Sequence, residues 1–233
     1  MTVDEERRSA STQIFVTGDV LDSDGVIVLE SSMEHHLTRV LRLGEGEYVS
    51  VSDGAGRWRL AGVIHAGGSL ALEPAGPVVA KRRLHPPLTI ATAIPKGDRV
   101  DWLVQKAVEI GVDTVQLLHT ERSVVRWKAE RAAKQVERLN RIAHEAARQS
   151  RRVWLPEVQP PVPVLDVLAS SVVAEPGGRN VAAGDTSIAI GPEGGWSPRE
   201  LANAGARVQL GPNVLRTETA ALVAATLCVS NSR

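Results

Sequence analysis

The clearest structural signal in this chain is the segment Ser187-Ile-Ala-Ile-Gly-Pro-Glu-Gly-Gly-Trp-Ser-Pro-Arg-Glu200. Its first four residues predict a short buried strand, and the glycines that follow rule out a helix or a continued strand. Ser197, with proline next and glutamate three positions on, predicts a helix start with a capping box. Ligands of α/β sheets bind beyond the carboxyl ends of strands, where glycines let a backbone approach closely. The glycine-rich exit is therefore a candidate pocket.

A second unit of the same kind follows at once. Residues 207–210 predict a strand, 211–216 its exit loop, and Thr217 the cap of an alanine-dense helix that runs to Val229. So much alanine predicts a very close packing partner for this helix. Two strand–loop–helix units in succession would set their backbone-rich loops side by side. The alternative is that both are ordinary turns in which glycine only supplies the geometry.

The rest of the chain shows two different sequence patterns. Residues 14–76 hold short alternating runs between turn signals, which predict a small antiparallel barrel interrupted by one helix at Met33–Leu41. From residue 88 onward, apolar strands alternate with helical segments, which is typical of an α/β domain. We expect a disordered N-terminus at 1–13, a linker at 77–87 and the α/β domain at 88–233.

Composition excludes several classes of protein. The 233 residues carry no net charge and a single cysteine, Cys228, so an internal disulfide is impossible and a reducing cytoplasm is expected. No apolar run is long enough to cross a bilayer, and the acidic start does not resemble a secretory signal. Neither a dinucleotide-binding nor a nucleotide-phosphate glycine motif is present. His35 and His36 lack partners at metal-ligand spacing, so no metal site is expected.

Several motifs together carry a resemblance to a known family. Ile190-Gly-Pro-Glu-Gly-Gly195 and Leu210-Gly-Pro-Asn-Val-Leu-Arg-Thr-Glu-Thr-Ala220 resemble the two signature motifs of the knotted SPOUT methyltransferases. The residues of both motifs most closely resemble those of the ribosomal RNA small subunit methyltransferase E family. Further matches are His35–Arg42, Ile94–Arg99, Gln105–Gly111, Glu121–Ser123 and Glu145–Arg152. Many members have an acidic residue where this chain has Arg148, which puts an acid–base role there in doubt.

The resemblance implies an N-terminal PUA-like barrel that binds RNA and a C-terminal SPOUT domain with a trefoil knot. It implies methylation of N3 of a uridine in small-subunit ribosomal RNA by S-adenosyl-L-methionine, in a cytoplasmic homodimer without metal or membrane. Two alternatives stay open: a SPOUT methyltransferase for another RNA position or a ribose hydroxyl, and a non-catalytic RNA-binding assembly factor. The residues expected to hold the cofactor are Ile94, Pro95, Ile190, Gly191, Pro192, Glu193, Gly194, Gly195, Leu210, Gly211, Leu215, Arg216 and Thr219.

Uridine N3 carries a proton at neutral pH, so the reaction needs a carboxylate that removes it or a cation that stabilises the deprotonated imide. Arg216 and Glu218 are the candidate catalytic residues because they are ionisable groups beside the loops; Glu193 is a further candidate. The alternatives are that Glu218 only favours the positive end of its helix and that Arg216 clamps the loop.

A basic block runs from Glu121 to Arg152, with ten lysines or arginines against four glutamates. It could be a solvated helix face, but an RNA phosphate backbone is the partner that the resemblance favours. Trp127 and Trp154 flank this block and either pack in the core or stack on a base. The candidate RNA contacts are Arg39, Arg42, Lys96, Arg122, Arg126, Arg148, Arg151 and Arg152.

Overall fold

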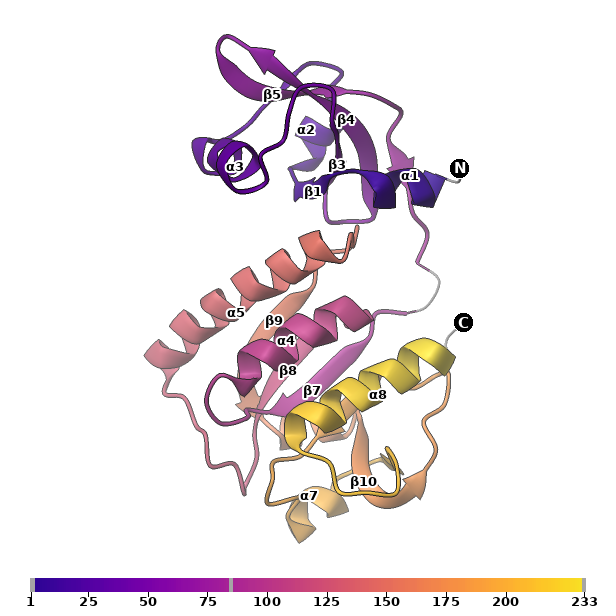
Figure 1. Cartoon of the computed structure of the whole chain (residues 1–233). Helices are drawn as coiled ribbons and strands as arrows, with labels where there is room; N and C mark the ends of the chain where they lie inside the picture. The colour runs from indigo at the N-terminus through magenta and orange to yellow at the C-terminus, as the bar shows by residue number, and fades with distance from the viewer. Residues whose placement is uncertain (1–2, 84–85, 232–233) are drawn as a thin grey trace. The chain divides into compact units, whose positions relative to one another are not determined.

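The computed structural model describes residues 3–83 and 86–231, which divide into two compact units (Figure 1). The first unit contains the chain up to Arg83 together with Ala147–Leu155, and the second contains the remainder. The second unit is therefore interrupted in sequence, which the expected continuous domain at 88–233 did not anticipate.

The first unit is built on a six-stranded sheet. Its strand order is β1 (Thr12–Phe15), β3 (Tyr48–Ser52), β4 (Arg57–Ala66), β5 (Ser69–Pro74) and β2 (Ile27–Val28), with β6 (Val79–Ala80) also paired to β4. All pairs are antiparallel except β1 with β3, which are parallel, so the antiparallel prediction was wrong for β1.

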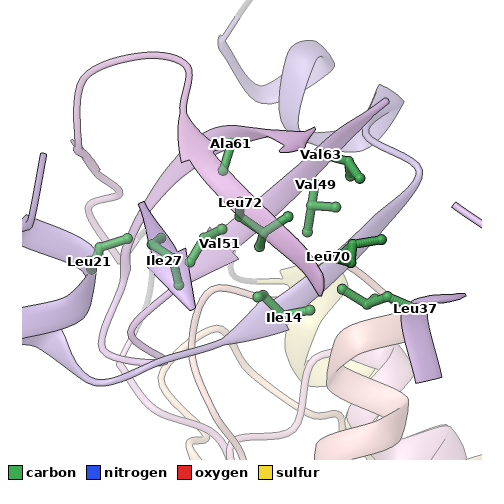
Figure 2. Close-up of a cluster of buried hydrophobic side chains, with 10 residues drawn as sticks. All are labelled: Ile14, Leu21, Ile27, Leu37, Val49, Val51, Ala61, Val63, Leu70 and Leu72. Carbon is green, nitrogen blue, oxygen red and sulfur yellow. The ribbon is translucent and has the colours of Figure 1, made fainter. Parts of the chain in front are cut away.

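One face of this sheet forms the core of the unit. Alternation places Val49 and Val51 of β3 on the same face, and cross-strand pairing sets Val49 against Ala61 and Val63 against Leu72. Figure 2 shows this cluster closed by Leu37 from the helical segment and by Leu21 of α2 (Gly18–Asp22), both fully buried. Burial of this apolar surface is what stabilises so small a unit.

The predicted helix at Met33–Leu41 is present but irregular. An α-helical turn, α3 (Ser31–His35), continues into a π-helical turn, η1 (His36–Val40). Arg42, just beyond, adopts a left-handed backbone with φ of 55°. Isolated π turns often occur at functional sites, and this one carries the exposed Arg39.

The N-terminus differs from the expected disorder. Val3–Ser9 forms helix α1, and Thr12 and Gln13 begin β1. Arg7 is only 4% exposed, lies 5.8 Å from the ring centroid of Trp58, and donates a hydrogen bond to the carbonyl of Arg151. These contacts tie the segment to residues of the first unit that lie far away in the sequence.

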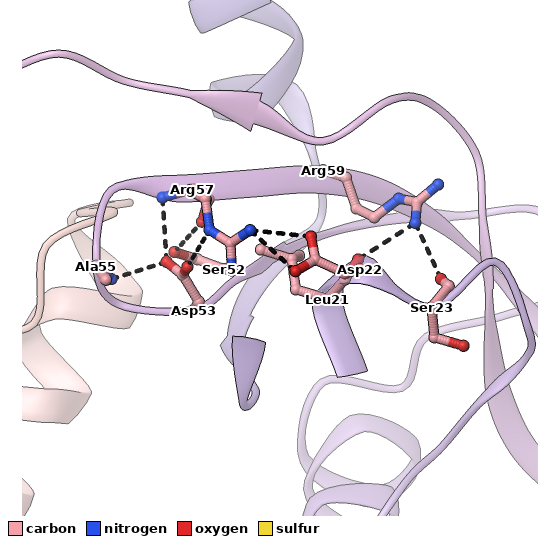
Figure 3. Close-up of polar contacts among 8 residues, drawn as sticks. All are labelled: Leu21, Asp22, Ser23, Ser52, Asp53, Ala55, Arg57 and Arg59. Carbon is pink, nitrogen blue, oxygen red and sulfur yellow. Dashed lines mark hydrogen bonds and ion pairs between the residues drawn. The ribbon is translucent and has the colours of Figure 1, made fainter. Parts of the chain in front are cut away.

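Figure 3 shows how two arginines of β4 tie the sheet to α2. Arg57 donates to Asp53 across the β3–β4 hairpin, with Nε to Oδ2 at 2.7 Å, and to Asp22 at 2.9 and 3.0 Å. Arg59 is 7% exposed and donates to the carbonyls of Leu21 and Ser23. Carbonyl groups at the end of α2 and just beyond it thereby accept hydrogen bonds from a side chain of the sheet.

The segment Ala147–Leu155 joins the first unit through the β3–β4 hairpin. The amide of Gly56 donates to the carbonyl of Val153 at 2.8 Å, and the amide of Leu155 donates to the carbonyl of Gly54 at 2.9 Å. A Cβ on Gly56, whose φ is +97°, would lie 2.2 Å from the Trp154 ring. Trp154 thus packs on the hairpin, where the guanidinium of Arg83 lies 4.1 Å from its centroid.

The second unit is a fully parallel six-stranded sheet. Its order is β12 (Ala206–Val208), β10 (Val172–Arg179), β11 (Ser187–Ile190), β7 (Thr89–Ala93), β8 (Thr114–His119) and β9 (Glu157–Pro163). The helices are α4 (Arg99–Ile110), α5 (Ala129–Gln149), α6 (Leu165–Leu168), α7 (Pro198–Ala202) and α8 (Thr217–Asn231). The predicted alternation of strands and helices is confirmed.

Helix α8 packs as its composition predicts. Figure 1 shows it beside α4, and it contacts β7 and β11 as well. Ala221, Ala224 and Ala225 are fully buried, which lets the backbones approach closely. Cys228 is buried in the same helix, and burial raises the pKa of its thiol to about 11. It is an inert core residue.

Candidate functional site

The glycine-rich loop after β11 is held in place by its own helix. Ser197 accepts a hydrogen bond from the amide of Glu200, and the carboxylate of Glu200 accepts one from the amide of Ser197 at 2.7 Å. The predicted capping box is therefore confirmed, with Pro198 as the first residue of α7. Gly195 supplies a φ of +67° for the turn that closes on Pro192.

Glu200 also reaches a second loop, which the sequence did not predict. This side chain is fully buried, and its other oxygen accepts from the amide of Glu121 at 2.8 Å. Arg122, the next residue, donates to the carbonyl of Gly194 at 3.0 Å. The loop after β8 and the loop after β11 are thus joined at two points.

The two predicted loops do lie side by side. The hydroxyl of Thr217 donates to the carbonyl of Gly191 at 3.1 Å, which joins the start of α8 to the first loop. Thr217 was expected to cap α8 with its side chain; instead it is the first helical residue and its hydroxyl is engaged by the neighbouring loop.

A third segment completes the site. In β10, both Ala174 and Arg179 pair with Val208, so the residues between them bulge out of the sheet. The indole Nε1 of Trp196 donates to the carbonyl of Ala174 at 3.0 Å and fixes the bulge to the first loop. A Cβ on Gly178 would lie 2.5 Å from the amide nitrogen of Val208, so the bulge depends on glycine there.

These three segments enclose a cavity of about 280 Å³. Its size is close to the lower end of the range for small-molecule sites. Its lining consists of Ala174, Glu175, Pro176, Ile190, Gly191, Pro192, Glu193, Gly195, Trp196, Leu210, Gly211, Asn213, Val214, Leu215, Thr217 and Ala220.

Eight of the expected cofactor residues line this cavity: Ile190, Gly191, Pro192, Glu193, Gly195, Leu210, Gly211 and Leu215. The other five do not. Ile94 and Pro95 are buried after β7, Gly194 contacts Arg122, and Arg216 and Thr219 are exposed to solvent. Thr219 follows Thr217 by two helical positions, so it faces the other side of α8. The bulge residues and Trp196 were missed, because no local motif shows that β10 meets the first loop.

The two candidate catalytic residues have different environments. Arg216 is exposed and follows Leu215 at the cavity. Glu218 is 7% exposed, with Oε1 3.7 Å from Nη1 of Arg99. Its Oε2 is buried and accepts no hydrogen bond from the described residues. Its carboxylate is directed toward α4 rather than the cavity, which favours the structural alternative for Glu218.

The expected RNA contacts fall into two groups. Arg39, Arg42, Lys96, Arg122 and Arg126 are exposed, although Arg126 also donates to the carbonyl of Thr120 at 2.6 Å. The other three are half-buried within the first unit. Arg148 lies 2.6 Å from Nε2 of His36, and Arg151 donates to the carbonyls of Ala10 and Ser11. Burial, reinforced by Arg7, lowers the pKa of Arg151. These residues help to hold the unit together.

Other kinds of site find no support in the described parts of the chain. Over residues 3–83 and 86–231, no group of three histidine, cysteine or acidic side chains is placed to hold a metal ion. No helix within those ranges has the length and apolar character to span a membrane. Trp127 is 7% exposed and packs in the core, as the alternative to base stacking predicted.

Comparison with known proteins agrees with this geometry. Residues 82–229 match the family model described as an RNA methyltransferase domain, and residues 35–72 match an RNA methyltransferase PUA domain. The ribosomal RNA small subunit methyltransferase E of Mycobacterium bovis is 32% identical over 91% of this chain and 88% of its own. That of Synechocystis is 33% identical over 86% of this chain and 72% of its own.

Solved structures are similar over nearly the whole length. The methyltransferase E of Neisseria gonorrhoeae, bound to S-adenosyl methionine, superposes with a TM-score of 0.78 at 28% identity, over 92% of this chain and 94% of that one. A putative Legionella pneumophila methyltransferase in complex with the same cofactor gives 0.80 at 28% identity, over 94% and 96%. The matches cover both units and the cavity loops, and the chain therefore belongs to the ribosomal RNA small subunit methyltransferase E family.

Proposed function

We propose that this protein transfers a methyl group from S-adenosyl-L-methionine to N3 of one uridine in small-subunit ribosomal RNA. The observation that carries the proposal is the cavity between the two Gly-Pro loops, together with family membership over most of the chain. We further propose that the methyltransferase domain has the trefoil knot of its family and that the protein acts in the cytoplasm, where its ribosomal substrate is.

The residues present fit the proposed cofactor. A Cβ on Gly191 would lie 3.0 Å from the Trp196 ring, so glycine lets the indole pack against the first loop at the cavity wall. The carbonyls and amides of such loops suit the polar edge of a purine, and Leu210 and Leu215 offer apolar walls. When bound, S-adenosyl-L-methionine would supply an activated methyl group on a sulfonium, so that no nucleophilic side chain is needed.

Among the catalytic candidates, the geometry favours Arg216. Its exposed guanidinium next to the cavity is free to approach the oxygens of a uracil base and stabilise the deprotonated imide. We assign Glu218 a positioning role, in which its contact with Arg99 orients the first turn of α8. The RNA is held by the exposed cations of both units, with the extruded base recognised by shape.

We also propose that the active species is a homodimer. Val214 lines the cavity, yet its side chain is 94% exposed, and Trp102 on α4 is 47% exposed. Cover from a second copy of the chain would remove such apolar groups from water. Light scattering at micromolar concentration would test this, and a monomeric mass would contradict it.

The test of the function is modification mapping. Deletion of the gene should remove one N3-methyluridine from small-subunit ribosomal RNA, and the purified protein with S-adenosyl-L-methionine should restore it. An unchanged uridine together with the loss of a different methylation would favour another RNA position. Saturable cofactor binding without any methyl transfer would favour the non-catalytic assembly factor.

A further inference from the structure

The bulge of β10 places a carboxylate at the cofactor cavity that no local motif reveals. Glu175 and Pro176 line the cavity because the chain leaves the sheet after Ala174 and returns at Arg179. Gly178 packs against the backbone of β12, where a side chain would not fit. The position of Glu175 is therefore set by the fold of the bulge rather than by a free loop.

A second carboxylate lines the same cavity. Glu193 belongs to the loop after β11, and Glu175 and Glu193 are the only ionisable side chains among the described residues of the lining. Neither carboxylate forms an ion pair or a hydrogen bond with the described part of the chain. The cavity wall therefore carries two carboxylates that no ion pair within the described residues neutralises.

We infer that Glu175, together with Glu193, makes this cavity selective for the positively charged methyl donor over its neutral demethylated product. The inference rests on the proposed function. S-adenosyl-L-methionine has a net charge of about +1 near neutral pH, whereas S-adenosyl-L-homocysteine has none, because a sulfonium replaces a thioether. The two molecules otherwise present the same adenosine and amino-acid groups.

The charge balance of the reaction gives this selectivity a role in turnover. Transfer breaks the sulfur–methyl bond and forms a nitrogen–methyl bond at N3, while the bonding electron pair remains on sulfur. The imide proton passes to water. The sulfur becomes neutral, so the attraction between the ligand and the two carboxylates weakens as soon as the methyl group has left. Product release is thereby favoured over product retention.

The experiment measures binding and not activity. Isothermal titration without RNA compares S-adenosyl-L-methionine, S-adenosyl-L-homocysteine and sinefungin, which carries an ammonium where the donor has its sulfonium. We expect Glu175→Gln to weaken the binding of the two cationic ligands about tenfold, equivalent to about 1.4 kcal/mol. The binding of the neutral product should weaken less than twofold. Glu193→Gln should act in the same direction. Glu130→Gln on α5 is the matched control, an exposed glutamate outside the cavity lining.

Equal weakening of all three ligands would overturn the inference, since it would mean that Glu175 binds a group shared by donor and product. An unchanged ratio of donor to product affinity in both variants would overturn it as well. In the wild type, the ratio should fall as salt rises, because ions screen the carboxylates, and this needs no variant. Absence of any saturable donor binding would contradict the proposed function instead.

Discussion

Replacing Glu200 with alanine tests whether this buried carboxylate joins the two loops at the site. The side chain is fully buried and accepts hydrogen bonds from the amides of Ser197 at 2.7 Å and Glu121 at 2.8 Å. Both partners are backbone amides, which remain in the chain when the carboxylate is removed. The substitution therefore leaves two donors without their acceptor and a small void.

The magnitude follows from these contacts. A hydrogen bond to a charged group contributes about 1.5–3 kcal/mol to stability. The cost of removing the carboxylate from water offsets part of the stabilisation that the two hydrogen bonds provide. We expect a net loss of about 3 kcal/mol in the free energy of unfolding. For a protein of this size, about 2–4 °C of melting temperature is lost per kcal/mol, which predicts a decrease of about 6–12 °C.

The assay is thermal unfolding followed by circular dichroism, with the neighbouring Arg199→Ala as control. The side chain of Arg199 is 71% exposed and lies 3.6 Å from Glu121, so its loss should change the melting temperature by less than about 2 °C. A Glu200→Ala protein that melts within about 2 °C of the wild type would refute the reasoning, since the two amides would then have found other acceptors.

Three further predictions concern the same unit. Gly178→Ala should cost about 1–3 kcal/mol of stability, measured by urea unfolding, because the added methyl group meets the backbone of β12; an unchanged midpoint would show that the bulge can shift. Arg122→Ala should weaken binding of S-adenosyl-L-methionine, titrated without RNA, about two- to tenfold through the lost bond to Gly194; an unchanged affinity would leave Arg122 a phosphate contact only. The guanidinium of Arg179 lowers the pKa of Asp185 by hydrogen bonding, so this stabilisation is present above the unfolded value of about 3.9 and is lost as pH falls through the folded one. The melting temperature of Asp185→Asn should accordingly lie below that of the wild type at pH 7 and approach it below about pH 4; a gap independent of pH would contradict the assignment.

Local patterns predicted most elements of the second unit. Strand β11 and the capping box of α7 both lie at the residues that the sequence predicted. Each depends on contacts between residues near in sequence, where periodicity and capping chemistry act directly. The same holds for the pocket loops, whose glycines and prolines mark the strand exits.

The missed features all depend on distant partners. Arg7 of the N-terminal helix contacts Trp58 and Arg151, and the segment Ala147–Leu155 joins the first unit through glycines of a hairpin. The sequence also suggested an N-terminal sheet that is antiparallel throughout, but β1 pairs with β3 in parallel. Strand direction within a sheet depends on how connections cross it, which local alternation does not encode.

Local sequence was enough to predict the strand–loop–helix units and the two Gly-Pro loops at the cavity, because backbone conformation there depends on the residues present. Three features of the site became visible only in the folded chain: Glu200 binds the amide of Glu121, Glu175 lines the cavity from a bulge in β10, and Glu218 lies beside Arg99. Side-chain partners across a sheet are selected by packing among elements far apart in the chain, and the electrostatics of the site follow from that packing.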